Sequence, residues 1–174
     1  MAKKTTGPGV AVKRRRKSLP VIGWREWISL PHLGIADIKA KIDTGARSSA
    51  LHAFNIKQVR KDGRDLVTFN VHPYQRDTET TIHCEAPLAG RRAVRNSGGK
   101  TELRPTIETV VELFGQRWHI DLTLTSRDVM GFRMLLGRQA VRRRFVIHPG
   151  RSFLARKSPQ YCLPAAKPRA EEKK

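Results

Sequence analysis

The stretch Ile42-Asp43-Thr44-Gly45-Ala46 decides how this chain is interpreted, because it ends an alternating, strand-like run with a carboxylate and a turn. A strand would deliver Asp43 at its end, Gly45 permits a tight turn, and the Thr44 hydroxyl can hydrogen-bond near the carboxylate. Asp-x-Gly is also ordinary turn chemistry, so a simple strand-end turn stays open as an alternative. A second segment, Met134-Leu135-Leu136-Gly137-Arg138, follows about 90 residues later, and the pair is much more specific than either part.

The chain is strongly basic, with 35 Lys and Arg against 15 Asp and Glu and a formal net charge of +20 over 174 residues. The excess is uneven, since residues 1–20 contain no acid at all, yet residues 21–155 carry a positive balance as well. Such a charge attracts polyanions or acidic polypeptides by long-range steering. We therefore expect an acidic partner or substrate.

Only two cysteines are present, Cys84 and Cys162, which indicates a reducing compartment rather than a disulfide framework. No stretch approaches the roughly 18 apolar residues of a membrane span, and the basic N-terminus lacks the apolar part of a secretory signal. We expect a cytoplasmic protein that makes no membrane contact. The length favours one domain with tails. We predict a disordered basic tail over residues 1–18, a folded domain over 19–157 and a second disordered tail over 158–174.

Between the tails, short runs of β-branched and apolar residues alternate with turns. Strands are predicted over Val21–Ser29 and Ile35–Ile42. Two hairpins are predicted, one joining 55–60 to 66–71 through Asp62-Gly63 and one joining 106–113 to 118–124. A short helix over Gly137–Arg143 and a strand over Phe145–Ile147 complete the pattern. This organisation favours a mainly β domain, a small barrel or sandwich, over an α/β fold.

From Trp24 to Arg151 the chain resembles the bacterial family labelled "ATP-dependent zinc protease", whose motifs are those of retropepsin-like aspartic peptidases. Three segments carry the resemblance: Lys41–Ala53, Arg104–Thr109 and Met134–Arg138. It implies a small closed β-barrel of the retropepsin type and an aspartic endopeptidase activity, with neither a cofactor nor a metal predicted. Members are often linked with enzymes that ligate glutamate onto proteins or peptides, which implies substrates with acidic or glutamate-extended ends.

The resemblance makes Asp43 the catalytic carboxylate, with Thr44 and Gly45 forming the turn that holds it. Leu135–Gly137 would form the strand and loop packed beneath it. Peptide hydrolysis by this route uses two carboxylates, one activating water as a general base and the other, protonated, polarising the scissile carbonyl. This chain has one such motif, so catalysis implies a homodimer with Asp43 and its symmetry mate at the two-fold axis.

One position departs from the family pattern. Retropepsins usually follow Asp-Thr-Gly-Ala with an Asp that pairs with the Arg of the later Gly-Arg, but here that place holds Arg47 while Arg138 remains. Two arginines cannot form this ion pair, so Arg47 could instead bind a substrate carboxylate in bidentate fashion. The alternative is an exposed arginine or a pair with a nearby Glu. The residues predicted to contact substrate are Ala46, Arg47, Ser48, His52 and Arg104, although structural hydrogen bonding is the other interpretation of Ser48 and His52.

Three other functions remain open at this point. The first is a metal-dependent peptidase, although the sequence lacks a His-Glu-x-x-His motif. His83-Cys84 with His72 forms only a partial set of metal ligands, and His83 and Cys84 are unfavourable as ligands of one ion because neighbours in a strand point to opposite faces. The basic runs Lys13–Lys17 and Arg142–Arg144 suit a binding protein that contacts RNA or the ribosome without sequence specificity and without catalysis. Few aromatic residues are available for base stacking, which argues against a dedicated module. The third alternative is a β-barrel that dimerises without catalysing.

Overall fold

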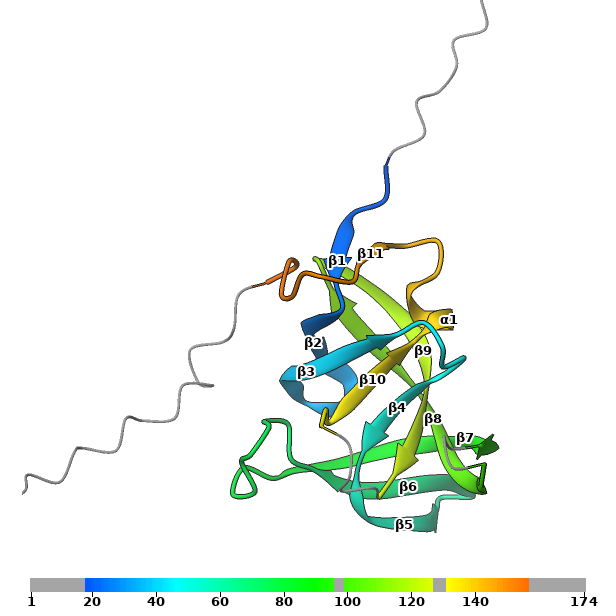
Figure 1. Cartoon of the computed structure of the whole chain (residues 1–174). Helices are drawn as coiled ribbons and strands as arrows, with labels where there is room; N and C mark the ends of the chain where they lie inside the picture. Colours follow the sequence, from blue (N-terminus) through cyan, green and yellow to red (C-terminus); the bar gives the residue numbers. More distant parts are fainter. Residues whose placement is uncertain (1–17, 96–98, 127–130, 157–174) are drawn as a thin grey trace, which may run out of the picture.

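A computed structural model of the chain describes residues 18–95, 99–126 and 131–156. Strands make up most of these ranges, together with a 3₁₀-helix and a short α-helix (Figure 1). The elements are β1 (Val21–Gly23), β2 (Arg25–Leu30), η1 (Pro31–Leu33), β3 (Ile35–Asp43), β4 (Ser49–His52), β5 (Phe54–Lys61), β6 (Arg64–Val71), β7 (Ile82–Arg95), β8 (Thr101–Leu113), β9 (Gln116–Thr125), β10 (Met134–Gly137), α1 (Arg138–Val141) and β11 (Val146–His148). The prediction of a mainly β domain with one short helix is confirmed.

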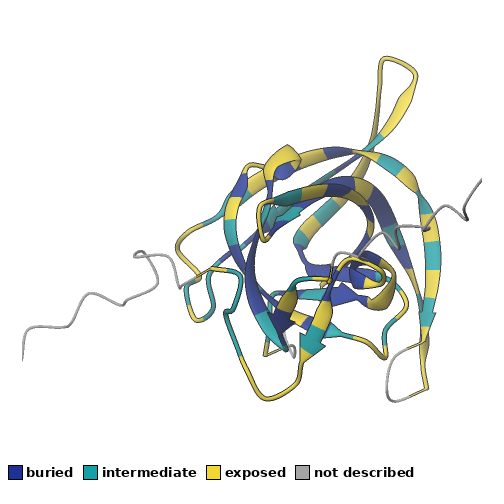
Figure 2. Ribbon diagram, turned by 90° about the horizontal axis from the view of Figure 1, so that it is seen from above, coloured by how far each residue is buried: buried dark blue, intermediate teal, exposed yellow. Residues whose placement is uncertain are grey.

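Nine strands form one sheet in the order β2-β3-β10-β4-β9-β8-β7-β6-β5. A pairing between Ser29 of β2 and Glu112 of β8 closes part of this sheet into a ring. Seen from above, the strands curve around an interior in which the buried residues gather (Figure 2). β1 and β11 form a separate parallel pair, with Val21 opposite Val146.

The core forms because successive side chains of a strand point to opposite faces of the sheet. In β6 the inward residues Val67, Phe69 and Val71 are buried, whereas the residues between them are partly exposed. Complete burial of side chains of this size stabilises the fold by roughly 1.5–3 kcal/mol each. Within the described ranges, no helix has the length and apolar character needed to cross a membrane.

The sequence did not predict β7, and it placed the start of β8 at residue 106 although the strand begins at Thr101. Both strands contain a proline, Pro87 and Pro105, and proline removes a donor from the sheet, so the pattern disfavours a strand there. In the structure Pro87 pairs with Leu66 and Pro105 pairs with Arg91, and the β7–β8 register shifts between Leu88 and Gly90, where Gly90 has a φ of 142°. Such a bulge is not visible in a periodic pattern.

Three boundaries also differ from the prediction. The strand expected over Val21–Ser29 is two strands that are interrupted at Trp24. The helix is shorter than Gly137–Arg143, because Arg142 leaves the helical region with φ −57° and ψ 139°. The last strand begins one residue later than expected, at Val146. The predicted tails, residues 1–18 and 158–174, lie outside the described ranges apart from Ser18 and stay predictions.

The segment 151–156 is fastened onto β1 and β2 by Glu26, whose side chain is fully buried. Glu26 Oε1 accepts hydrogen bonds from the backbone N–H of Gly23 at 2.6 Å and of Leu154 at 2.9 Å. Its Oε2 accepts one from the N–H of Ala155 at 3.1 Å. Buried carboxylates need such donors, and these three join the first and last parts of the described domain.

Replacing Glu26 with Gln is therefore expected to lower the free energy of unfolding by about 3 kcal/mol, because an amide NH₂ would face backbone N–H groups that the carboxylate now satisfies. Urea denaturation followed by circular dichroism measures this effect. Glu112→Gln is the matched control, since Glu112 pairs with the exposed Arg117 at 2.6 Å and should change stability by less than about 1 kcal/mol. Equal effects of the two substitutions would contradict the role given to Glu26.

Candidate active site

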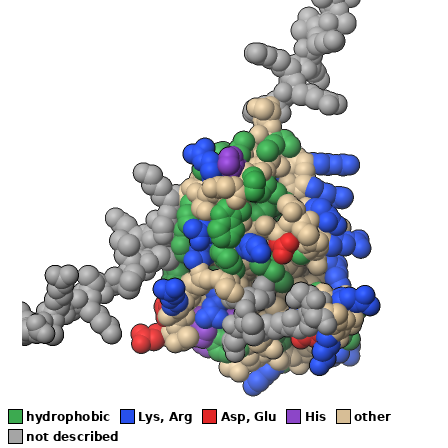
Figure 3. Space-filling view, viewed as in Figure 1, with side chains coloured by type: hydrophobic (Ala, Val, Ile, Leu, Met, Phe, Trp, Pro, Cys, Tyr) green, Lys and Arg blue, Asp and Glu red, His purple; other side chains and the backbone are tan. Residues whose placement is uncertain are grey.

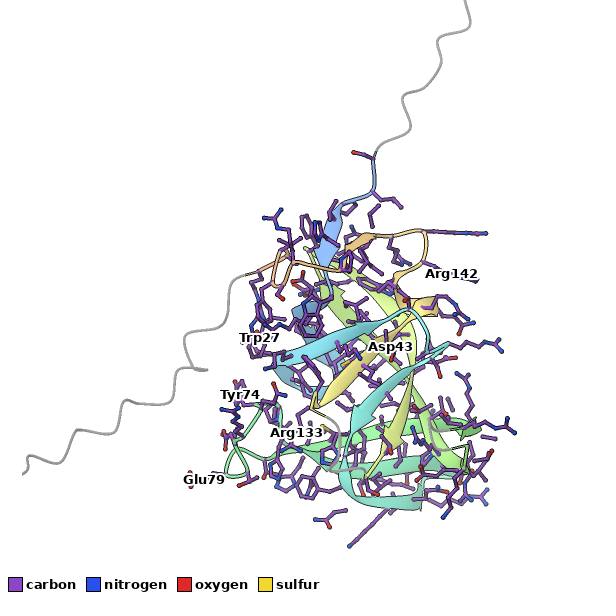
Figure 4. All side chains as sticks on the ribbon, in the orientation of Figure 1. Trp27, Asp43, Tyr74, Glu79, Arg133 and Arg142 are labelled. Atoms are coloured by element: carbon purple, nitrogen blue, oxygen red, sulfur yellow. The ribbon has the colours of Figure 1, made fainter. Side chains whose placement is uncertain are left out.

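Asp43 is the last residue of β3 and is half-buried where the strand passes into the loop 44–48 (Figure 4). Its Oδ1 accepts hydrogen bonds from the backbone N–H groups of Gly45 and Ala46, both at 3.0 Å. The other oxygen, Oδ2, accepts no hydrogen bond from the part of the chain that the structure describes. The turn therefore holds the carboxylate in one orientation and leaves one of its oxygens available for chemistry.

β10 carries the second motif to the side of Asp43. It lies between β3 and β4, parallel to β3 and antiparallel to β4, and places Gly137 opposite Asp43. A Cβ added to Gly137 would lie 2.4 Å from the carbonyl carbon and oxygen of Ser48. The backbone of Gly137 is extended, with φ −74° and ψ 165°, which any residue can adopt. Close approach of β10 to the backbone of Ser48, rather than backbone freedom, is what requires a glycine here.

The segment after β10 fastens the loop 44–48 through its carbonyl groups. The backbone N–H of Arg138 donates to the Ala46 carbonyl at 2.8 Å, and that of Gln139 donates to the Arg47 carbonyl at 3.1 Å. The Arg138 guanidinium adds a bond from Nη1 to the Thr44 carbonyl at 2.9 Å. Arg138 thus supports the turn that holds Asp43 within one chain and has no acidic partner among the described residues.

Sequence reasoning missed the side chains that join this loop to the sheet. The Ser49 hydroxyl accepts a hydrogen bond from the Gly137 N–H at 3.1 Å, and the Ser49 carbonyl accepts one from the Thr123 hydroxyl at 2.9 Å. Both residues are buried. A serine directly after a turn gives little signal for this role, because its partners lie 74 and 88 positions away in the sequence.

The structure brings together the predicted residues that follow Asp43 in the sequence. Thr44, Gly45 and Ala46 form the turn itself, Arg47 is exposed, and Ser48 is half-buried against Gly137. The remaining two predicted residues lie elsewhere, as the strand register shows.

His52 is buried at the far end of β4, opposite Thr125 of β9. A strand advances about 3.3 Å per residue, which places His52 about 10 Å further along the sheet than Ser49. Arg104 is buried on β8 and pairs with Glu102, with 3.0 Å between Nε and Oε2. Neither residue therefore belongs to the turn that holds Asp43.

No group of three His, Cys, Asp or Glu side chains that could hold a metal ion occurs among residues 18–95, 99–126 and 131–156. In the partial set suggested by the sequence, the His83 ring hydrogen-bonds to Asn70 at 2.7 Å on the outer surface. The thiol of Cys84 is buried and donates to the Leu33 carbonyl at 3.5 Å, and burial raises the pKa of this thiol to about 11. His83 and Cys84 thus face different environments and cannot share an ion from these positions.

The surface around Asp43 is basic. Lys41, Arg47, Arg138 and Arg142 are all exposed, on β3, on the loop 44–48 and on or next to α1. Figure 3 shows Lys and Arg side chains gathered along the right-hand edge of the view, the side on which Figure 4 places Arg142. Exposed cations on the elements that adjoin Asp43 suit an anionic ligand better than a cationic one.

Known proteins resemble this chain to different extents. The chain is 46% identical over 129 residues to a probable alpha-L-glutamate ligase of Desulfotalea psychrophila, which covers 74% of this chain and 28% of that protein. A probable alpha-L-glutamate ligase of Shewanella pealeana is 42% identical over 133 residues, which covers 76% of this chain and 29% of that protein. The chain thus spans less than a third of the length of these curated relatives.

Among solved structures, the fold is similar to that of Lpg0085 from Legionella pneumophila, a protein described as having unknown function. The TM-score is 0.67 at 26% identity, and the match covers 80% of this chain and all of that one. The family model described as "RimB-like: Retropepsin-like aspartic endopeptidase RimB" matches residues 21–158, which include Asp43 and the whole ring of strands. With its Asp-Thr-Gly turn held beside β10, the chain belongs to the RimB-like family of retropepsin-like aspartic endopeptidases.

Proposed function

We propose that this protein is a homodimeric aspartic endopeptidase of the cytoplasm that hydrolyses peptide bonds in acidic, glutamate-rich peptides or protein tails. The observation that carries the proposal is the Asp43 carboxylate. It is held at Oδ1 by the N–H groups of Gly45 and Ala46 and is half-exposed at the edge of the sheet. Family membership supports the reaction type.

The proposed chemistry needs two such carboxylates, and each chain contributes Asp43. Two carboxylates a few ångströms apart do not both ionise easily, so they share one proton. The ionised carboxylate takes a proton from water as the water oxygen attacks the scissile carbonyl, and the protonated one donates a hydrogen bond to the carbonyl oxygen. Proton transfer to the leaving nitrogen then breaks the C–N bond and releases a carboxylic acid and an amine.

The preference for acidic substrates is supported by the exposed cations next to Asp43. Arg47 follows the catalytic turn directly, its backbone is held by Gln139, and its guanidinium has no acidic partner in the described part of the chain. Arginine binds carboxylates through two parallel hydrogen bonds, which gives direction as well as charge. Relatives named as glutamate ligases suggest which acidic residue is involved. Their ligase activity is not proposed for this chain, which matches only 28–29% of their length.

Cleavage of a peptide of consecutive glutamates tests the proposal, with wild type and Asp43→Asn compared in the presence of a metal chelator. Cleavage that survives the chelator and disappears in the variant supports the aspartic mechanism. Cleavage that the chelator abolishes would favour a metal-dependent peptidase. Salt-sensitive RNA binding that is lost on deletion of residues 1–18, without any cleavage, would favour an RNA- or ribosome-associated protein.

Arg47→Gln is expected to reduce kcat/KM about tenfold for a glutamate peptide and to change it less than about twofold for an uncharged peptide, because the charged two-bond contact with the carboxylate is lost. Steady-state kinetics on both peptides measure the difference. Arg60→Gln is the matched control, since it removes the same charge from an exposed position on β5. If Arg60→Gln reduced cleavage of the glutamate peptide as much, overall charge rather than Arg47 would explain the preference.

A further inference from the structure

Two arginines converge on a hollow of about 370 Å³ that the proposed chemistry does not use. Arg91 of β7 and Arg104 of β8 both line it, and Leu124 and Thr125 from the end of β9 form part of its wall. On β9, Leu122 pairs with Ser49 and Thr125 pairs with His52. The hollow therefore lies at the level of His52 rather than at the level of Ser49 and the turn that holds Asp43. At about 3.3 Å per residue, Thr125 lies about 10 Å along the strand direction from the level of Ser49. The strands β10, β4 and β9 lie between β3 and β8, so the hollow is displaced from Asp43 across the sheet as well.

Arg104 gives the hollow an unusual donor. Its side chain is only 8% exposed, and its Nε donates to Glu102 at 3.0 Å. A guanidinium carries five N–H groups, and the four on its terminal nitrogens make no hydrogen bond among the described residues. The terminal nitrogens of Arg104 are not among the fully buried polar atoms that lack a partner, so water or a ligand can reach them. Arg104 thus has N–H donors available for an anion, which a purely structural ion pair with Glu102 would not leave.

Arg91 faces the same hollow from the neighbouring strand. Its Nη2 donates to the Gln58 side-chain oxygen at 2.7 Å, which holds the guanidinium in place across the sheet. Two guanidinium groups against the single carboxylate of Glu102 leave the lining with a net positive charge. The Thr125 hydroxyl is buried in the wall and has no hydrogen-bond partner in the described part of the chain.

Part of the wall between these groups is apolar. Leu103, with 58% of its surface exposed, and Leu124, which is buried, both border the hollow. A short aliphatic stem that ends in an anion would match this combination, because methylene groups pack on the leucines while the anion reaches the guanidinium groups. A glutamate side chain has this form.

We propose that this hollow is a subsite that binds the carboxylate of a glutamate side chain of the substrate, with Arg104 as its buried donor and Arg91 as its outer one. This inference rests on the proposed function, since it places the substrate along the sheet from Asp43. An extended peptide advances about 3.3–3.6 Å per residue, so the bound glutamate would lie several residues from the scissile bond. The subsite would make the enzyme prefer substrates with several acidic residues over substrates with a single one.

Binding is measured on the full-length Asp43→Asn protein, which holds the peptide without cutting it. The probe is a fluorescently labelled peptide of consecutive glutamates, titrated by anisotropy. Arg91→Gln is expected to weaken binding about tenfold, and Arg104→Lys, which keeps the charge and loses the planar fork, by a similar factor. Arg95→Gln is the control, because Arg95 is exposed on the same strand and lies outside the hollow. It should change the affinity less than about twofold. Circular dichroism checks that each variant is folded.

A second titration uses peptides in which one glutamate at a time is replaced by glutamine. Replacing the glutamate at one peptide position should weaken binding to the Asp43→Asn protein in which Arg91 is kept. The same replacement should have no effect on binding to the protein that also carries Arg91→Gln. Equal losses from Arg91→Gln and Arg95→Gln, or equal sensitivity at every peptide position, would overturn the subsite and leave only general charge attraction. Absence of any peptide binding would overturn it as well.

The two proposals fail in different ways. If the peptide binds in an Arg91-dependent manner and wild type does not cut it, the endopeptidase proposal is wrong while the subsite stands. If wild type cuts the peptide with a KM that neither Arg91→Gln nor Arg104→Lys changes, the subsite is wrong while the endopeptidase proposal stands. KM is the informative quantity, because a subsite remote from the reacting bond contributes binding rather than proton transfer.

Discussion

Asp43→Asn is expected to lower kcat for a glutamate peptide by at least about a thousandfold, because an amide can neither take a proton from water nor share one with its symmetry mate. The substitution should leave the fold intact. Asn has nearly the same shape, and its Oδ1 can still accept the N–H groups of Gly45 and Ala46 that now bind the carboxylate at 3.0 Å. Thermal unfolding of the variant should therefore match wild type within a few degrees while peptide cleavage, followed by mass spectrometry, disappears.

Mixing the two proteins tests whether the active unit is a dimer. If each active site needs Asp43 from both chains, an equal mixture of wild type and Asp43→Asn chains, refolded together, should retain about one quarter of the wild-type activity, since only wild-type pairs are active. Independent monomers would retain about one half. Asp121→Asn is the control partner, because Asp121 is exposed on β9 and its carboxylate pairs with Arg92 at 2.8 Å rather than with the turn that holds Asp43. A mixture with Asp121→Asn should show no loss.

Gly137→Ala is expected to lower the free energy of unfolding by about 3 kcal/mol or more, because its Cβ would overlap backbone atoms of Ser48. The clash distance is 2.4 Å to both the carbonyl carbon and the carbonyl oxygen, and neither can rotate away as a side chain would. To relieve this overlap, Ser48 and the adjoining β4 would have to move away from β10. That movement would break the Gly137 bond to the Ser49 hydroxyl and loosen the loop that Arg138 fastens. Stability and peptide cleavage should therefore fall together.

Urea denaturation and cleavage assays on the same preparations measure the two effects. Gly131→Ala is the matched control, since a Cβ there would meet no atom within 4 Å among the described residues. Its effect on stability should stay within about 0.5 kcal/mol. A Gly137→Ala protein as stable as Gly131→Ala would show that β4 and β10 are less closely packed than the structure indicates. A Gly137→Ala protein that is unstable but fully active per folded molecule would show that this packing stabilises the fold without being needed by the turn that holds Asp43.

Much of the architecture was accessible from local pattern. Residues 35–42 alternate and end in Asp-Thr-Gly, and they form a strand that ends in a turn, because side-chain period and glycine position are local properties. The hairpin through Asp62-Gly63 was predictable for the same reason, and both of these residues have positive φ. β7 was not predictable, since its strand character comes from pairing with β6 and β8 rather than from its own residues.

The candidate site shows the same division. The carboxylate, the turn and the unmatched arginine at position 47 are all visible in the sequence, because each depends on neighbouring residues. The support for the turn is not visible, since Arg138 reaches the Thr44 carbonyl across 94 positions and Ser49 meets Gly137 across 88. The placement of His52 and Arg104 away from Asp43 also required strand register, which no alternation pattern contains.

The sequence by itself determined that this chain has one Asp-Thr-Gly turn at the end of a strand, a mainly β fold and a strongly basic surface, because composition and short-range pattern depend only on residue order. Tertiary structure alone decided that Gly137 lies opposite Asp43, that Arg138 holds the loop 44–48, and that Arg91 and Arg104 share one hollow. These three arrangements depend on which strands pair and in what register. That choice follows from burial of the whole core, in which side chains far apart in the sequence must fit together.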